Sequence, residues 1–374
     1  MRKPSTASRT WAASGVGPAD LFSPDNEDVR IRWAETFGVS PENPFALLAH
    51  MGRDCAGGAT FVPHGDSARS SEVVAVDDAR IASRLRAIKS EPSEWTVAGD
   101  RWSLAGAQSK FTLTHLPDGT WAEVTGDLPS SHIVKPGVAE YREQALVEHV
   151  SMTVARSVGL SAAKTDYREF AGEPALVVTR FDRRRARDGS LVRVHQEDLC
   201  QALAVYPRNK YEANRGPSSA RIARVLRDNS TVGEDDVWQF ARALVFNYLI
   251  GAPDAHAKNY SIVLAPGRVR LAPLYDVASA LPYDATGDSE IDLAAMAIGG
   301  RRRFGTVHGR HWDTMAEAMG IDAERLREEI RRQAAAIPAT FSHELDEFNA
   351  TELRKRLVPR LDQLCKATVG QLQD

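Results

Sequence analysis

Cysteine is scarce in this chain, with only three residues in 374. Cys55, Cys200 and Cys365 are scattered, so their spacing matches no metal-binding motif, and three thiols cannot form a full set of disulfide bonds. The sequence therefore predicts buried free thiols in a protein of the reducing cytoplasm.

Long hydrophobic runs and a strong net charge are also missing. The longest apolar run, around residues 243–252, is too short to cross a bilayer, which takes about 20 apolar residues. The basic N-terminus lacks the apolar stretch of a secretory signal. A net charge of −3 gives no general attraction to nucleic acid or to anionic membranes. These absences indicate a soluble protein with no membrane partner, in which any nucleic-acid contact comes from a local basic patch.

The hydrophobic patterns change character along the chain. After an irregular tail, we expect a helix start at 41–48, a tight loop at 52–58 leading to a strand at 60–62, and a polar connector with one helix, 76–88. Short β runs then extend from about Trp95 to Val134.

The second half of the pattern is mainly helical. A helix is predicted at 139–158, stopped by Gly159, and a β pair follows within 165–179. From about His195 the helical pattern dominates. This order predicts an α+β fold with two lobes, a β-rich N-terminal lobe and an all-α C-terminal lobe.

One long helix ends beside a candidate catalytic residue. Apolar residues recur at spacings of three and four from residue 237 to 249, which predicts a strongly amphipathic helix. Gly251 stands where a helix-ending glycine belongs, and Pro253 prevents continuation. Asp254 is therefore expected on a loop at the end of a rigid, buried helix.

The residues after Asp254 follow the order of a protein-kinase active site. Asn259 comes five residues later, a hairpin with a Pro-Gly turn is predicted at 260–271, and Asp276 follows directly. In kinases a carboxylate accepts the proton of the incoming hydroxyl, while an amide oxygen and a second carboxylate hold Mg²⁺ against the phosphates. Each residue alone fits an ordinary cap or loop, but the ordered set favours Asp254 as base and Asn259 and Asp276 as metal ligands.

Other residues near this sequence have two open interpretations. His256 is either a packed loop histidine or an ATP contact, and Lys258 either helps the transferred phosphate or is solvated. Upstream, Lys135 ends a β run, and kinases use such a lysine to bind phosphates, held by a helix glutamate. Glu148 lies in an apolar helix stripe and is the natural partner, with Glu143 as the alternative.

A loop between two β runs offers a weak phosphate-binding signal. Residues 103–110 contain a single glycine, so this is no standard glycine-rich loop, although its backbone N–H groups could face phosphates. Two arginine clusters add alternatives. Residues 183–185 fit a solvated hairpin, and residues 301–303 fit either an exposed loop or a contact with DNA phosphate.

Seven motifs in order resemble the HipA family, the serine/threonine kinase toxins of bacterial toxin–antitoxin pairs. They are Ser103-Leu-Ala-Gly-Ala-Gln-Ser-Lys110, His132-Ile-Val-Lys135, Arg180-Phe-Asp-Arg183, His195-Gln-Glu-Asp-Leu-Cys-Gln201, Lys210-Tyr-Glu212, Gly251-Ala-Pro-Asp-Ala-His-Ala-Lys-Asn259 and Leu274-Tyr-Asp-Val277. The resemblance runs from about Ala19 to beyond Ala336. It implies a two-lobed protein-kinase-like fold, ATP and Mg²⁺ as cofactors, a helix-turn-helix antitoxin similar to HipB, and operator DNA reached through the antitoxin.

Site residues carried over by the resemblance fall into three groups. Those over the phosphates are Ala105, Gly106, Ala107, Gln108, Ser109, Lys110 and Lys135. The linker Thr179, Arg180 and Phe181 would contact adenine through its backbone. The remaining residues are Asp254, His256, Ala257, Lys258, Asn259, Tyr275 and Asp276. Ser103 matches the position of an autophosphorylated serine, whose phosphate should eject the loop and switch the kinase off.

The resemblance also implies a domain organisation. The predicted divisions are a tail at 1–18, a shortened HipA N-terminal region with its connector at 19–95, an N-lobe at 96–194 and a helical C-lobe at 195–374, with the HipA-like C-terminal domain at about 101–340. Family members usually begin with a small β-rich subdomain, for which only the irregular first residues stand here. A separate small protein is one expected source of that piece.

The predicted function is phosphoryl transfer from ATP to a serine or threonine of a host protein. Some family members act on an aminoacyl-tRNA synthetase, but this sequence does not name the target. One alternative belongs to another class: a truncated, non-toxic partner-binding component of an antitoxin–DNA complex. A second alternative, a kinase for a small molecule, uses the same catalytic residues. The four residues Lys135, Asp254, Asn259 and Asp276 argue against a pure binding module, which has no physical need of them.

Overall fold

The computed structural model of the chain describes residues 21–65, 71–93, 100, 102–104, 106–284 and 290–373, so the predicted tail lies outside the described residues. The chain forms two compact units. The first unit comprises Met1–Leu146, Lys164–Arg208 and Val263–Ala265, and the second comprises Val147–Ala163, Asn209–Ile262 and Pro266–Asp374. The compact units do not follow the predicted lobes, which divide at residue 194. The first unit continues to residue 208, and the second unit includes residues 147–163, so the lobe boundary stays a prediction.

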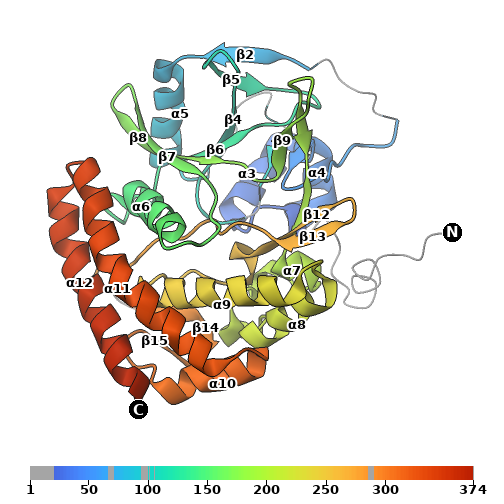
Figure 1. The fold of residues 1–374 in the computed structure, drawn as a ribbon. Coiled ribbons are helices and arrows are strands. Elements are labelled where there is room, and N and C mark those ends of the chain that lie inside the picture. The colour runs from blue at the N-terminus through green and yellow to red at the C-terminus, as the bar shows by residue number, and fades with distance from the viewer. Residues whose placement is uncertain are drawn as a thin grey trace. The chain divides into compact units, whose positions relative to one another are not determined.

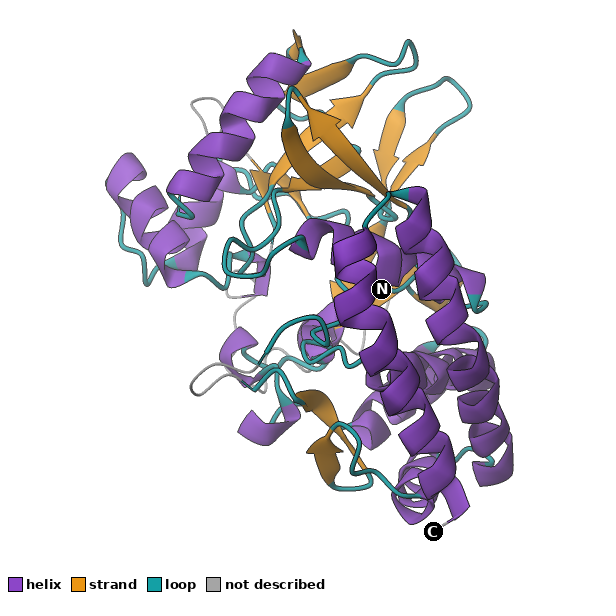
Figure 2. Ribbon diagram, turned by 90° about the vertical axis from the view of Figure 1, so that its left-hand side faces the viewer, coloured by secondary structure: helices purple, strands orange, loops and turns teal. Residues whose placement is uncertain are grey.

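A six-stranded antiparallel sheet forms the centre of the first unit (Figures 1 and 2). Its order is β2-β5-β4-β6-β8-β7, and every neighbouring pair is antiparallel. The strands are Val73–Val76 (β2), Phe111–His115 (β4), Trp121–Val124 (β5), His132–Lys135 (β6), Thr165–Phe170 (β7) and Glu173–Thr179 (β8). The expected β-rich N-terminal region is therefore confirmed.

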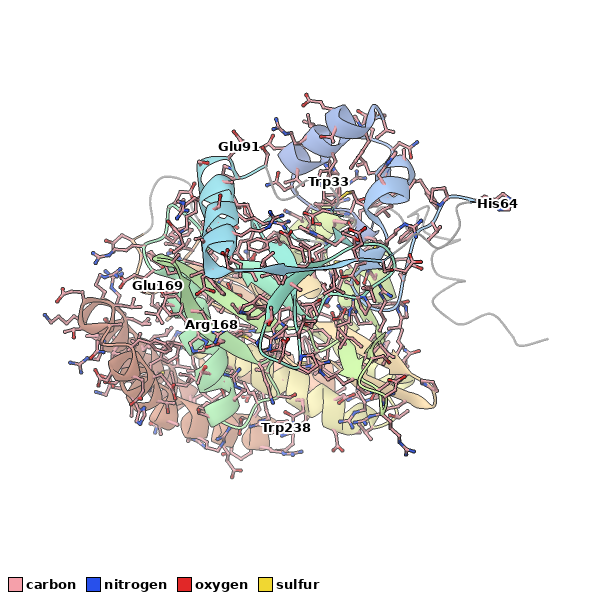
Figure 3. The ribbon with its side chains drawn as sticks, turned by 90° about the horizontal axis from the view of Figure 1, so that it is seen from above. Trp33, His64, Glu91, Arg168, Glu169 and Trp238 are labelled. Carbon is pink, nitrogen blue, oxygen red and sulfur yellow. The ribbon has the colours of Figure 1, made fainter. Side chains whose placement is uncertain are left out.

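One hydrophobic core joins this sheet to the helices of the first unit. These helices are Glu27–Phe37 (α3), Pro44–Met51 (α4) and Asp78–Ser90 (α5). Trp33 of α3, labelled in Figure 3, is 1% exposed, and Leu85 of α5 and Phe111 of β4 are fully buried in the same cluster. Burying a large apolar side chain contributes about 1.5–3 kcal/mol, so this cluster fixes the helices against the sheet.

The predicted helices are present, but their ends differ by a few residues. Those expected at 41–48, 76–88 and 139–158 run Pro44–Met51 (α4), Asp78–Ser90 (α5) and Gln144–Ser157 (α6). Side-chain caps set the first two starts, because Asn43 accepts from the Ala46 N–H and Asp77 from the Arg80 N–H. Glu143 has a φ of 63°, a left-handed conformation that a helix interior excludes, so α6 begins directly after it.

The strand expected at 60–62 was wrong. The extended pair of this region is instead β1 (Asp54–Cys55), which runs parallel to β3 (Trp102–Ser103). Phe61 donates its N–H to the Gly52 carbonyl at 2.8 Å, and its ring packs edge-on against Phe22, 5.4 Å between centroids. Phe61 is therefore held by aromatic packing rather than by a β-ladder, and Val62 is exposed.

The arginine hairpin of the first unit is only partly as predicted. Strands β9 (Arg183–Arg185) and β10 (Leu191–Arg193) pair antiparallel, but the Arg183 side chain is 1% exposed and not solvated. Arg184 and Arg185 are exposed, whereas Arg183 is buried. Strand β11 (His195–Asp198) follows, and Asp198 and Gln201 form a capping box at the start of α7 (Leu199–Ala202).

The second unit is mainly helical. Its helices are Ser219–Asn229 (α8), Gly233–Leu249 (α9), Gly309–Met319 (α10), Ala323–Glu347 (α11) and Thr351–Gly370 (α12), with most of α6. Figures 1 and 2 show α11 and α12 lying side by side. Among the residues that the structure describes, no helix is both long and apolar enough to span a membrane.

Four short strands lie between α9 and α10 in the chain, one of them divided between the two units, so the all-α description of the C-terminal lobe was too strict. They are Ser261–Ala265 (β12), Arg268–Leu271 (β13), Leu293–Ile298 (β14) and Arg301–Arg303 (β15). Strands β12 and β13 form the predicted hairpin after Asn259. Asp236 of α9 anchors it, because its carboxylate accepts the Leu271 N–H at 2.7 Å.

Candidate active site

The end of helix α9 presents Asp254 to solvent on a constrained loop. Gly251 has a φ of 59°, and a Cβ there would lie 2.7 Å from the Leu281 side chain, so only glycine fits without a shift. Its carbonyl also accepts the Ala280 N–H at 3.0 Å. The predicted helix end is confirmed, and the Asp254 side chain that follows is 60% exposed.

Hydrogen bonds within the loop fix the position of Asn259. The Asp254 carbonyl accepts the His256 N–H at 2.8 Å and the Asn259 side-chain Nδ2 at 2.6 Å. The Asn259 N–H donates in turn to the His256 carbonyl at 2.9 Å, within the short helix η3 (Ala257–Asn259). Because Nδ2 is held by the loop, the amide plane directs Oδ1 away from it, as a metal ligand requires.

Asp276 has an unusual backbone conformation. Its φ of 59° lies in the left-handed region, which costs a non-glycine residue about 1–3 kcal/mol and commonly marks a functional site. The neighbouring Tyr275 hydroxyl donates to the Lys258 carbonyl at 2.7 Å and lies 2.6 Å from the Ser261 Oγ. Tyr275 thus fastens the segment of Asp276 to the catalytic loop.

His256 is a neutral, buried histidine at the centre of this loop. Burial lowers its pKa to about 4, although the carboxylates of Asp254 and Asp276 act in the opposite direction. Its Nε2 lies 3.5 Å from the Asp254 Oδ1, and its Nδ1 is buried without a hydrogen-bond partner among the described residues. A neutral ring adds no charge beside a triphosphate, and the predicted ATP contact of His256 stays a prediction.

Tyr211 contacts the candidate base and was not singled out as a site residue from the sequence. Its hydroxyl donates to the Asp254 Oδ1 at 2.5 Å, and its ring packs edge-on against the His256 ring, 4.9 Å between centroids. In the sequence, Tyr211 is marked by its place in the motif of residues 210–212. That motif contributed to the family resemblance, but no chemical role was assigned to it.

The residues predicted to bind the phosphates lie in the first unit. Lys135 ends β6 and is 6% exposed, and Lys110 is 5% exposed. A Cβ at Gly106, whose φ is 108°, would lie 2.7 Å from the Lys110 Nζ, so the loop curls beneath that ammonium group. Ala105 lies outside the described residues.

Hydrogen bonds to two carbonyl groups orient the backbone of residues 106–108, the loop predicted to face the phosphates. The Gly106 carbonyl accepts the Asp25 N–H at 3.2 Å, and the Ala107 carbonyl accepts the Asn26 Nδ2 at 3.4 Å. In a trans peptide the N–H points opposite to the C=O, so the N–H groups of Ala107 and Gln108 face away from residues 25–26. The Gln108 side chain donates to the Gln144 Oε1 at 3.2 Å.

The glutamate proposed to hold Lys135 lies in the other unit. Glu148 of α6 is 1% exposed and belongs to the second unit, so its ion pair with Lys135 stays a prediction. The alternative, Glu143, pairs with Arg142 at 3.5 Å on the surface. A buried carboxylate needs a compensating partner, which continues to favour Glu148 over Glu143.

The linker residues are already engaged by the first unit. The Thr179 N–H donates to the Lys164 carbonyl at 2.9 Å, and the Arg180 N–H donates to the Ser131 carbonyl at 3.0 Å. The Arg180 guanidinium is 1% exposed and pairs with Asp182 at 2.9 Å and with Asp54 at 3.3 Å. Adenine contacts through this backbone are therefore restricted to its carbonyl groups and to Phe181.

The buried ion network around Arg180 explains several lowered pKa values. Asp54 and Asp182 are both buried, which alone would raise the pKa of each carboxyl, but the guanidinium groups of Arg180 and Arg183 hold both below the usual range. Ser130 also donates to Asp54 through its N–H at 3.0 Å and its hydroxyl at 2.6 Å. The network joins β1 to the residues after β8.

Ser103 is buried in the unmodified chain. It is 1% exposed, its register partner in β1 is Cys55, and its hydroxyl donates to the Phe22 carbonyl at 2.8 Å. A phosphoryl group cannot be accommodated in this position, because a dianion would be desolvated there without a partner.

The metal-binding prediction is consistent with the donor set. The described residues contain no group of three or more His, Cys, Asp or Glu that could hold a metal ion by itself. Mg²⁺ in kinases is bound by one or two protein oxygens together with substrate phosphates. The Asn259 Oδ1 and the Asp276 carboxylate stay the predicted pair, and Mg²⁺ bound there would supply charge neutralisation of the phosphates.

Comparison with known proteins gives concordant matches. Residues 19–62 match the HipA N-terminal domain, and residues 102–341 match the HipA-like C-terminal domain. A Sinorhizobium fredii protein described as a candidate kinase, Y4mE, is 36% identical over 313 residues, covering 81% of this chain and 73% of that protein. The serine/threonine-protein kinase toxin HipA of Shewanella oneidensis is 31% identical over 324 residues, covering 82% and 72%.

A solved structure shares the fold. It is the Shewanella oneidensis MR-1 toxin–antitoxin complex of HipA, HipB and operator DNA, in which a chain superimposes with a TM-score of 0.82 at 26% identity. The match covers 96% of this chain and 86% of that chain. Since both units contribute to this coverage, the fold is shared across the described chain.

Proposed function

The chain belongs to the HipA family of kinases, and from this premise we propose that it is a serine/threonine-protein kinase toxin of a type II toxin–antitoxin system. It transfers the γ-phosphoryl group of ATP to a serine or threonine of a host protein and so inhibits growth. The observation that carries this proposal is the exposed Asp254, set on a fixed loop with Asn259 and followed by the left-handed Asp276.

Asp254 acts as the base in this proposal. Its carboxylate accepts the proton of the acceptor hydroxyl while the hydroxyl oxygen bonds to the γ-phosphorus and the bond to ADP breaks. An exposed carboxylate suits this role, because the acceptor must reach it from solvent. Asn259 and Asp276 hold Mg²⁺ against the phosphates, and Lys135 and the loop of residues 106–110 hold the phosphates themselves.

The antitoxin and operator DNA are proposed partners. The related Shewanella oneidensis structure contains HipA with HipB and its operator DNA, which supports a helix-turn-helix antitoxin for this chain. The arginine cluster of β15 gives weaker support for direct DNA contact. Arg302 pairs with Glu290 at 3.5 Å, and Arg303 pairs with Asp292, so both guanidinium groups already have carboxylate partners.

Autophosphorylation of Ser103 is proposed as an off switch. Because the hydroxyl is buried against the Phe22 carbonyl, β3 must leave β1 before the serine can reach an active site. Once phosphorylated, the residue carries about two negative charges and cannot return, so the loop of residues 106–110 that follows β3 stays displaced.

Substitution of Asp254 tests the catalytic assignment. We expect Asp254→Asn to abolish ³²P transfer from ATP while ATP still binds, and Lys135→Ala to weaken ATP binding itself. Isothermal titration calorimetry measures binding, and autoradiography measures transfer. Full activity of Asp254→Asn would contradict the assignment of the base.

A further inference from the structure

Among the residues that the structure describes, two polar groups reach the Asp254 carboxylate, and both lie beside the same oxygen. The Tyr211 hydroxyl lies 2.5 Å from Oδ1, and the His256 Nε2 lies 3.5 Å from Oδ1. The carboxylate is otherwise exposed to solvent, with 60% of the side chain accessible. A carboxylate fixed through one oxygen presents the other, Oδ2, in a defined direction.

The loop that carries Tyr211 is itself rigid. The Tyr211 carbonyl accepts the N–H groups of Asn214 at 3.0 Å and of Gly216 at 2.9 Å. A Cβ at Gly216 would lie 2.5 Å from that same carbonyl oxygen, so the turn closes only with glycine. The tyrosine side chain therefore projects from a tight turn around the short helix η2 (Glu212–Asn214), not from a long open loop.

The two neighbours of Tyr211 anchor this turn on both sides. The Lys210 carbonyl accepts the Ala257 N–H of the catalytic loop at 3.3 Å. The Glu212 carboxylate accepts the Ala297 N–H of β14 at 2.7 Å. Lys210 and Glu212 thus tie the turn to the loop of Asp254 and to β14 by one hydrogen bond each, while Tyr211 closes the turn with two hydrogen bonds to its carbonyl.

We propose that Tyr211 is a positioning residue for phosphoryl transfer: its hydroxyl holds Oδ1 of Asp254, so that Oδ2 is directed at the acceptor hydroxyl. The inference rests on the proposed role of Asp254 as base. A base that is free to rotate spends less time in the productive geometry, so loss of the phenol hydroxyl lowers the rate of transfer without changing ATP binding.

Tyr211→Phe tests this inference, because it removes one oxygen and keeps the ring against His256. We expect kcat for transfer from [γ-³²P]ATP to casein, a generic serine-containing acceptor, to fall about tenfold, with KM for ATP and the melting temperature unchanged. Tyr206→Phe is the matched control, since the Tyr206 ring stacks with Arg208 at 4.6 Å outside this contact and should show wild-type kcat. Glu212→Ala should lower kcat in the same direction by loosening the turn.

The double variant Tyr211→Phe/Asp254→Asn distinguishes failure of this inference from failure of the base assignment. If Tyr211 acts through Asp254, the double variant is no less active than Asp254→Asn alone. An inactive Asp254→Asn with wild-type Tyr211→Phe overturns the role of Tyr211 only. An active Asp254→Asn overturns the base itself. If Tyr211→Phe lowers ATP affinity or the melting temperature in proportion to kcat, the role of Tyr211 is structural. If ³²P is found on Tyr211, the tyrosine is a phosphate acceptor. Either result overturns the inference.

Discussion

Replacing Arg180 with methionine should destabilise the first unit severely. The guanidinium is buried and makes five hydrogen bonds, two to Asp182, and one each to Asp54, the Ser130 hydroxyl and the Cys55 carbonyl. Methionine fills similar volume but leaves two buried carboxylates short of a cation. Breaking a buried ion pair from one side costs about 3–5 kcal/mol, and we expect a loss of that order in the free energy of unfolding.

Arg184→Met is the matched control for this substitution. Arg184 lies on the exposed face of β9, one residue from the buried Arg183, so its loss should change stability by less than about 0.5 kcal/mol. Urea unfolding followed by tryptophan fluorescence measures both variants, since Trp33, Trp102 and Trp121 are all buried in the first unit. Equal stability of Arg180→Met and Arg184→Met would refute the reasoning.

The pH dependence gives a second check on the same network. The pKa values of Asp54 and Asp182 are lowered in the folded chain, mainly by the charges of Arg180 and Arg183 acting against burial. Their stabilising contribution is therefore complete above the ordinary carboxyl pKa of about 4 and is lost as the pH falls through the lower folded values. The stability difference between wild type and Arg180→Met should accordingly shrink below about pH 4. A difference that stays constant at low pH would contradict an ionic origin.

Two further predictions concern the site. Ser103→Asp should lower ATP affinity and increase protease cleavage near residue 106, because a charge cannot occupy this buried position. Ser103→Ala should lose only about 1 kcal/mol of stability and keep ATP binding. Equal ATP affinity of the two variants would argue against displacement of the loop by the charge. NMR titration should find the His256 imidazole neutral down to a pKa of about 4, so this residue adds no ionisation to the pH–rate profile between pH 6 and 8; a titration of its ring signals near pH 6.5 would contradict the burial of the ring.

The helix end before Asp254 and the hairpin after Asn259 could be predicted because their signals are local. Gly251 and Pro253 end a periodic helix, and Asp254, Asn259 and Asp276 follow at fixed spacings around a turn. Short-range chemistry of this kind needs no knowledge of the tertiary fold. The helix ends were also close, and their errors arose where a cap residue or a left-handed Glu143 set the first turn.

Contacts between residues far apart in the chain could not be predicted from the sequence. The bond from Tyr211 to Asp254 joins residues 43 apart, with α8 and α9 between them. The burial of Arg183 depends on Asp54, more than a hundred residues earlier, so three successive arginines gave no sign of which one would face inward. The engaged N–H groups of Thr179 and Arg180 likewise depend on distant partners, Lys164 just before β7 and Ser131 just before β6.

The buried ion network around Arg180 limits where the gene for this protein can recombine. Asp54 lies in the segment that matches the HipA N-terminal domain, whereas Arg180 and Arg183 lie in the segment that matches the HipA-like C-terminal domain. A gene fusion or recombination event between residues 62 and 102 would separate the carboxylate from its two guanidinium groups and leave buried charges on the C-terminal piece. These buried ion pairs therefore couple the stability of the two segments.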